Sequence, residues 1–286
     1  MTVNVTRHGS PGPDDEEYAQ QLWEDLEDTI ESLPERPINF GMAMNDSLFC
    51  VQAWLAVNPE GSQLETWEAV TTALQVHSAA FICADTTQGE ADFMINHEVH
   101  TIPATGPQYY ANAGNWLTAF WLAIVCRDQE RMTRLCEISL DVLRASGAEG
   151  DEYVYHWVDV LQTYWLERPD LIEKLTLTFQ TSHPDVATIA PRELLQNILY
   201  QPIALFHRFL IKDRDAFNQA LLEAVQAHKA YWTATEKREG SVQGYLALGP
   251  LALACLAHDA GFPLDIETPY LPGELLRRAW VGEFPT

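Results

Sequence analysis

The stretch 151–166, DEYVYHWVDVLQTYWL, contains two polar residues that could form an acid–base pair. His156 and Asp159 are three positions apart, so on a helix they would share a face, with Glu152 one turn before His156. A histidine held by a carboxylate can act as a general base. The same spacing suits a structural hydrogen bond, and the sequence identifies no nucleophile or third group beside the pair. We therefore predict no catalytic residue and interpret Glu152, His156 and Asp159 as a possible polar seam.

The aromatic residues around this seam allow two interpretations. Tyr153, Trp157 and Tyr164 follow one helical stripe, and Val154 and Trp165 belong to a neighbouring one. Rings at this spacing could cage a ligand, but a helix that is apolar over most of its circumference usually lies at the centre of a fold. The pattern favours the core.

Motifs for metal, phosphate or nucleophile chemistry are weak in this sequence. The string HEVH, residues 97–100, is one residue short of the zinc-binding HExxH spacing, and on a strand its two histidines would face opposite sides. There is no phosphate-binding glycine loop, no dinucleotide fingerprint and no GxSxG turn. Five widely spaced cysteines indicate neither a disulfide framework nor a metal site. We expect no metal and no cofactor.

Apolar periodicity predicts an all-α fold of packed antiparallel helical hairpins in one compact domain. Residues 1–13 are expected to be a flexible N-terminus, and 14–286 a single α-helical domain. The stretch 92–102 departs from the helical pattern and predicts a small β-hairpin that turns at Asn96 and His97. The expected helical segments are 14–33, 37–58, 62–84, 116–147, 192–232 and a last hairpin over 242–258 and 273–280.

Two of these segments resemble each other. A shift of 85 residues aligns Arg127 and Asp128, which interrupt the first apolar run, with Lys212 and Asp213 in the second. The apolar positions that follow each break also coincide. We therefore predict two similar helical hairpins, and the missing 34-residue period argues against a regular solenoid.

The charge balance limits the class of partner. The chain has 17 Lys and Arg against 41 Asp and Glu, a formal net charge of −24. Such a charge disfavours nucleic acid and anionic membranes and favours a basic partner protein, although acidity also serves solubility alone. No secretory signal and no apolar run long enough for a bilayer are visible, so we expect a cytoplasmic protein.

Possible contact residues are acids and tyrosines. The N-terminal helix is dense in carboxylates, among which Glu24, Asp25 and Asp28 are candidate electrostatic contacts. Tyr109 and Tyr110, in a loop rich in proline and glycine, are candidate aromatic anchors. The alternatives are a simple solvated helix face and tyrosines that belong to the core.

Four strings carry a family resemblance. They are PATGPQYYANAGNWLTAFWLAIVCRDQERMTRLCEI (103–138), DEYVYHWVDVLQTYWLERP (151–169), ILYQPIALFHRFLIKDR (198–214) and GPLALACLAHDAGFPLDIETPYLP (249–272). Together they resemble the Immunity protein 49 family of bacterial polymorphic-toxin systems, over about residues 65–286. The resemblance implies an all-α protein that binds and neutralises a cognate toxin, usually encoded by the adjacent gene, and it transfers no catalytic residue. If that toxin were a nuclease, an acidic inhibitor could occupy its basic cleft as a phosphate mimic.

Two other function classes stay open at this point. One is a helical enzyme or small-molecule-binding protein that uses a pocket around His156 and Asp159, which a ligand-sized cavity beside the seam would favour. The other is a scaffold built on the two related hairpins, which a long concave groove would favour.

Overall fold

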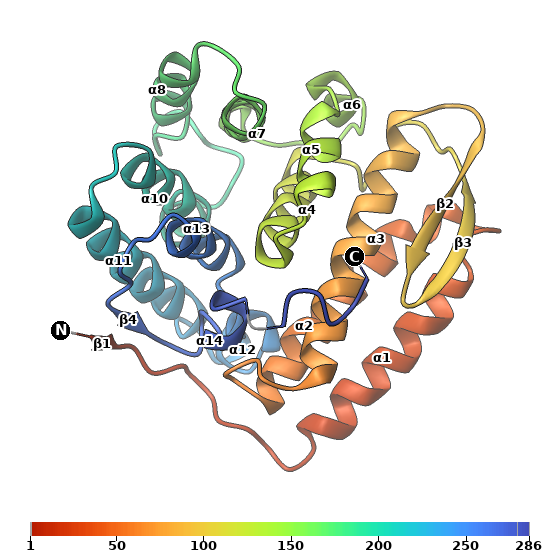
Figure 1. Cartoon of the computed structure of the whole chain (residues 1–286). Helices are drawn as coiled ribbons and strands as arrows, with labels where there is room; N and C mark the ends of the chain where they lie inside the picture. The colour runs from red at the N-terminus through yellow and green to blue at the C-terminus, as the bar shows by residue number, and fades with distance from the viewer. Residues whose placement is uncertain (1, 279, 286) are drawn as a thin grey trace.

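The computed structural model describes residues 2–278 and 280–285, and most of these residues are helical (Figure 1). The longer helices are α1 (Asp15–Glu31), α2 (Phe40–Val57), α3 (Leu64–Asp85), α4 (Ala113–Cys126), α5 (Gln129–Glu137), α7 (Glu152–Trp165), α8 (Leu171–Thr181), α10 (Gln201–Leu210), α11 (Arg214–Trp232) and α13 (Leu248–Asp259). Short helical segments are η1 (Pro37–Asn39), α6 (Leu140–Arg144), α9 (Arg192–Leu194), η2 (Leu195–Leu199, a π-helix), α12 (Glu236–Glu239), η3 (Val242–Tyr245) and α14 (Gly273–Leu276). The strands are β1 (Val3–Asn4), β2 (Glu90–Ile95), β3 (Glu98–Pro103) and β4 (Ile266–Glu267). The helical fold class is confirmed.

The centre of the fold consists of α2, α3, α4 and α13. α2 packs between α1 and α3, and α4 packs against both α3 and α13. α4 is buried from Ala119 to Cys126, and its Trp116 stacks on Phe120 with ring centroids 4.9 Å apart. These helices are nearly uniformly apolar because neighbours cover them on several sides.

The aromatic rings of α7 belong to the core, as the sequence pattern predicted. Tyr153, Tyr155 and Trp157 are buried. Trp157 meets Phe206 of α10 edge-on at 5.3 Å between centroids, and Tyr164 meets the same ring at 5.1 Å. The rings therefore attach α7 to α10.

The predicted β-hairpin is confirmed, with β2 and β3 antiparallel. Asn96 and His97 have φ values of 49° and 66°, as a tight two-residue turn requires, and asparagine tolerates this left-handed region. Phe93, Ile95 and Ile102 are buried, and β2 packs against α3.

The predicted relation between two hairpins is confirmed at the turn. Arg127 and Lys212 both adopt left-handed backbone, with φ of 58° and 56°. Asp128 and Asp213 then cap the next helix by accepting backbone N–H groups of Arg131 at 2.9 Å and of Ala216 at 3.0 Å. The second arms differ, because α11 is continuous whereas the first hairpin is broken between α5 and α6 at Ser139, whose side chain caps α6.

The N-terminal segment lies against the C-terminal part of the chain. β1 pairs in parallel with β4, and the segment then runs along one edge of the molecule to α1 (Figure 1). The backbone N–H of His8, a buried residue, donates to the Tyr270 hydroxyl at 3.0 Å. Residues 3–8 of the segment predicted to be flexible therefore have partners.

The second arm of the last predicted hairpin is shorter than expected. α13 forms, and α14 packs against it but has only four residues. The left-handed backbone of Arg278, with φ of 54°, does not continue a helix, and residue 279 of the predicted arm lies outside the described residues.

Candidate functional site

The outer face of α1 is a strip of exposed carboxylates. α1 buries Ala19, Leu26 and Ile30 and packs on α2, whereas Glu24, Asp25 and Asp28 are exposed. Within the part of the chain that the structure describes, no ion pair involves these three carboxylates. Their charge is therefore not neutralised inside the molecule, and it attracts basic groups from outside.

Asp46 on α2 extends this negative field. Partial burial raises its pKa above the usual value, and the nearby Asp25 carboxylate raises it further. Crowded carboxylates favour protonation, because each negative charge makes ionisation of its neighbour less favourable. A cation bound between α1 and α2 would relieve this repulsion.

Tyr109 lies beside the start of α2, near which two further apolar side chains are exposed. Its side chain is 58% exposed, and those of Ile38 and Met42 are 52% and 49% exposed. Its hydroxyl lies over Gly41, where an added Cβ would collide with the ring. Tyr109, Ile38 and Met42 form what we call the Tyr109 patch. Sequence analysis missed Ile38 and Met42, although their four-residue spacing outside the buried stripe of α2 was a signal.

Tyr110 does not share this exposure, which corrects the expectation that both tyrosines are surface anchors. Its side chain is fully buried, and burial raises its pKa to about 12. The ring lies 6.0 Å from Phe40 and 5.4 Å from Tyr109, between centroids. The two rings touch each other edge to face, with Tyr110 buried and Tyr109 exposed, so only Tyr109 is available to a partner.

The polar seam of α7 is divided among different partners. Nδ1 of His156 lies 3.0 Å from Oγ1 of Thr181, and Asp159 accepts from Nζ of Lys174 at 2.8 Å, both on α8. Glu152 bonds Arg144, which lowers the pKa of Glu152, and its Oε1 also lies 3.8 Å from Nε2 of His156. The structure does not pair His156 with Asp159 among the described residues. The seam joins α7 to its neighbours, and this arrangement gives no support to a general-base pair.

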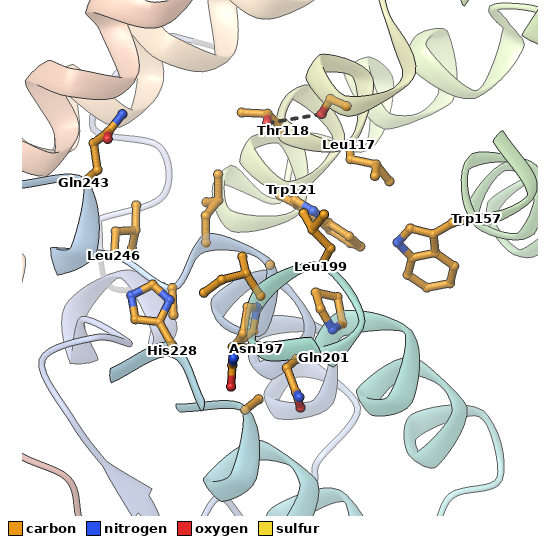
Figure 2. Close-up of a pocket in the computed structure, with 18 of the residues that line it drawn as sticks. Leu117, Thr118, Trp121, Trp157, Asn197, Leu199, Gln201, His228, Gln243 and Leu246 are labelled. Carbon is orange, nitrogen blue, oxygen red and sulfur yellow. Dashed lines mark hydrogen bonds between the residues drawn. The ribbon is translucent and has the colours of Figure 1, made fainter. Parts of the chain in front are cut away.

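A cleft opens on the other side of α7. It has a volume of about 350 Å³ and is bounded by α4, α7, η2, the start of α10, α11 and the segment from η3 to α13 (Figure 2). Trp121 and Trp157 line one side, and His228 lines another. None of the described residues that line it is Asp, Glu, Lys or Arg. Sequence analysis missed this cleft because its walls come from segments far apart in the chain.

The histidines give no sign of a metal centre. His97 is exposed in the turn of the hairpin, where its Nε2 lies 2.7 Å from Oε1 of Glu68 on α3. Over residues 2–278 and 280–285, no cluster of three or more His, Cys, Asp or Glu side chains could hold a metal ion. In the same residues, no helix combines the length and the apolar character needed to cross a membrane.

Comparison with known proteins identifies the family. The chain matches the family described as Immunity protein 49 over residues 58–275. The chain belongs to the Immunity protein 49 family. Membership implies toxin neutralisation, and it implies a cognate toxin as partner. Searches of curated proteins and of solved structures found no match.

The family match divides the candidate residues. Tyr109, the cleft residues on α4, α7 and α11, and the polar seam lie within the matched residues of this Immunity protein 49 member. α1 and α2 both precede residue 58, so the acidic strip lies outside the matched residues. Tyr109, the cleft and the polar seam therefore lie within the region common to the family, whereas the acidic strip lies in an N-terminal hairpin packed against that region.

Proposed function

We propose that this Immunity protein 49 family member acts in the cytoplasm by binding a cognate toxin, encoded by the adjacent gene. The acidic strip of Glu24, Asp25 and Asp28 and the exposed Tyr109 ring would contact a basic surface of that toxin. The observation that carries the proposal is the family match over residues 58–275. The protein acts by occupying the toxin surface and carries out no reaction.

The α1–α2 hairpin supports this choice of surface. The three carboxylates are exposed and form no ion pair with any of the described residues, and Asp25 is close enough to raise the pKa of Asp46 on α2. The Tyr109 patch lies at the N-terminal end of the same α2. Interfaces commonly combine an apolar anchor with surrounding charges, where the anchor supplies affinity and the charges supply association rate and specificity.

The test is a calorimetric titration of the purified product of the adjacent toxin gene into this protein at low and high salt. Tight binding that weakens as salt rises is expected, because exposed charges are screened beyond about 10 Å at 0.1 M salt. Absence of binding would refute that gene product as the partner. Tight binding that does not depend on salt would refute the acidic contact while leaving neutralisation intact.

Charge-matched variants locate the contact. Glu24→Gln, Asp25→Asn and Asp28→Asn together should weaken binding about tenfold, since exposed pairs contribute up to about 1 kcal/mol each. The control removes the same charge from exposed acids elsewhere, through Asp215→Asn, Glu223→Gln and Asp265→Asn. Equal effects of the two triple variants would mean that only net charge matters.

Tyr109→Ala tests the anchor separately. It should weaken toxin binding and leave the thermal midpoint nearly unchanged, since most of this side chain is already in water. Unchanged toxin affinity in Tyr109→Ala would remove Tyr109 from the interface.

A further inference from the structure

Three indole groups that form no hydrogen bond with the described residues of the protein line the cleft of Figure 2. Trp121 and Trp157 are 6% and 1% exposed, and their ring centroids are 6.2 Å apart. The third is Trp232, whose Nε1 is buried and has no partner among the described residues, whereas the buried Trp116 donates to the Leu135 carbonyl at 2.8 Å. Buried indole N–H groups normally have a partner.

Gly249 helps to keep one of these donors open. A Cβ added at Gly249 would lie 3.6 Å from Nε1 of Trp121 and would collide with the Pro202 ring at 2.8 Å. The backbone of α13 therefore approaches α10 closely only because residue 249 has no side chain. This close approach leaves the indole edge of Trp121 at the cleft.

The other polar groups of the cleft are uncharged. Burial lowers the pKa of His228 to about 4, so the imidazole is neutral at pH 7, and its Nε2 lies 2.9 Å from the Gly244 carbonyl. The amide nitrogens of Asn197 and Gln201 donate to the Glu193 and Gln196 carbonyls. A cleft of about 350 Å³, lined mainly by apolar side chains and with a few polar groups, has the size and character of a small-molecule site.

We propose that this cleft binds a small, uncharged and mainly apolar molecule whose carbonyl oxygen accepts a hydrogen bond from the indole N–H of Trp121, Trp157 or Trp232. The ligand is neutral, because the lining offers no cation to an anion and no carboxylate to a cation. It is a free molecule, because α1, which carries the acidic strip, and α11, which lines the cleft, lie on opposite sides of the molecule (Figure 1). A toxin held by α1 therefore leaves the cleft accessible.

The π-helix η2 forms one wall of the cleft and supports this assignment. Leu199 of η2 and Trp121 of α4 lie next to each other at the cleft (Figure 2). π-helical turns are rare and are found frequently at functional sites, because the wider turn displaces side chains from their helical positions. Here the turn directs Asn197, Ile198 and Leu199 toward the cleft.

The test uses acetophenone as the probe and ethylbenzene, which lacks the carbonyl, as the matched compound. The readout is the set of tryptophan indole N–H signals in a ¹H–¹⁵N spectrum of the full chain. Acetophenone should shift the signal of Trp121, Trp157 or Trp232 in a saturable manner, with a Kd on the order of millimolar for so small a ligand. Trp121→Phe, Trp157→Phe and Trp232→Phe identify the signals by removing them. Ethylbenzene should bind roughly fivefold more weakly, since it lacks one hydrogen bond.

Thr118→Phe should fill the cleft and abolish the shift. Its matched control is Thr176→Phe, because both threonines lie on helices and donate to the carbonyl four residues earlier, but Thr176 is exposed on α8 away from the cleft. If none of the Trp121, Trp157 and Trp232 signals shifts, or if the shift survives in Thr118→Phe, the proposal is wrong. Equal binding of the two probes would exclude the carbonyl contact.

Toxin binding distinguishes this inference from the proposed function. If acetophenone leaves the spectrum unchanged while Thr118→Phe weakens toxin binding and Thr176→Phe does not, the cleft holds a toxin side chain, and the small-ligand proposal fails. If acetophenone binds but no toxin does, the ligand site stands and the proposed function fails.

Discussion

Asp151 offers the sharpest test of how the loop before α9 is held in place. Its buried carboxylate precedes α7 and does not cap that helix. Oδ1 accepts the backbone N–H groups of Thr188 at 2.7 Å and of Ile189 at 2.9 Å, and Oδ2 accepts that of Ala190 at 2.8 Å. One side chain therefore fixes a loop that lies 37 to 39 residues away.

Oδ1 of Asp151 accepts two hydrogen bonds and Oδ2 accepts one, so substitution by Asn and by Ala should destabilise the protein by different amounts. Asp151→Asn keeps Oδ1 and places an amide against the Ala190 N–H, and we expect it to cost about 1.5 kcal/mol, the lower limit for a hydrogen bond to a charged group. Asp151→Ala removes all three bonds. We expect about 3 kcal/mol rather than the full sum, because Thr188 and Ile189 are exposed and their N–H groups can turn to water.

The assay combines thermal unfolding with hydrogen exchange at the three amides. In Asp151→Ala the exchange of the Thr188, Ile189 and Ala190 amides should accelerate more than that of the α7 amides, because the loop opens without global unfolding. Asp185→Asn is the control, since Asp185 is in the preceding stretch with its side chain 76% exposed, and it should change stability by less than about 0.5 kcal/mol. Unchanged stability and unchanged exchange in Asp151→Ala would refute the role assigned to this carboxylate.

Three further predictions follow from burial and capping. Burial lowers the pKa of His77 to about 4, so as pH falls the unfolded protein binds a proton at this residue before the folded protein does. The free energy of unfolding should therefore fall as pH drops from 6.5 to 4. His77→Gln should reduce that fall by about 3 kcal/mol in denaturant titrations. The pKa of Asp46 is raised, so its ionisation destabilises the folded state as pH rises through that pKa. Asp46→Asn should therefore raise the thermal midpoint at pH 7 and should have no such effect below pH 3.8. An unchanged midpoint at pH 7 would contradict the burial argument. Asp128→Ala and Asp213→Ala should each lower the free energy of unfolding by about 1 kcal/mol, because each removes a helix cap. The loss should be larger for Asp128, because its carboxylate also pairs with Arg131. A smaller loss at Asp128 than at Asp213 in the same unfolding assay would count against this reasoning.

The sequence was sufficient for features that depend on local patterns. The helices, the hairpin turn at Asn96 and His97 and the paired breaks at Arg127 and Lys212 all depend on residues within a few positions of one another. At the paired breaks, the residue after each is an aspartate that caps the next helix, so the chemistry of the turn is visible in the sequence itself.

Local sequence patterns could not predict which residues the candidate side chains contact. His156 and Asp159 have the spacing of a pair, but α8 supplies Thr181 and Lys174 and separates them. Tyr109 and Tyr110 are neighbours in one loop, and only the position of α2 decides which ring is buried. Long-range packing, which periodicity does not record, determined both outcomes.

The pairing of β1 with β4 determines how late in synthesis the N-terminal segment can reach its folded position. Val3 pairs with Ile266, and the bond from His8 to Tyr270 spans 262 positions. Because the chain is made from its N-terminus, α1 and α2 can form early, whereas the β1 strand and His8 must wait for residues 265–270 to leave the ribosome. A polypeptide that stops before these residues could display the acidic strip but would lack the pairing of β1 with β4 and the bond from His8 to Tyr270, so its N-terminal segment takes its final position only when translation of this region ends.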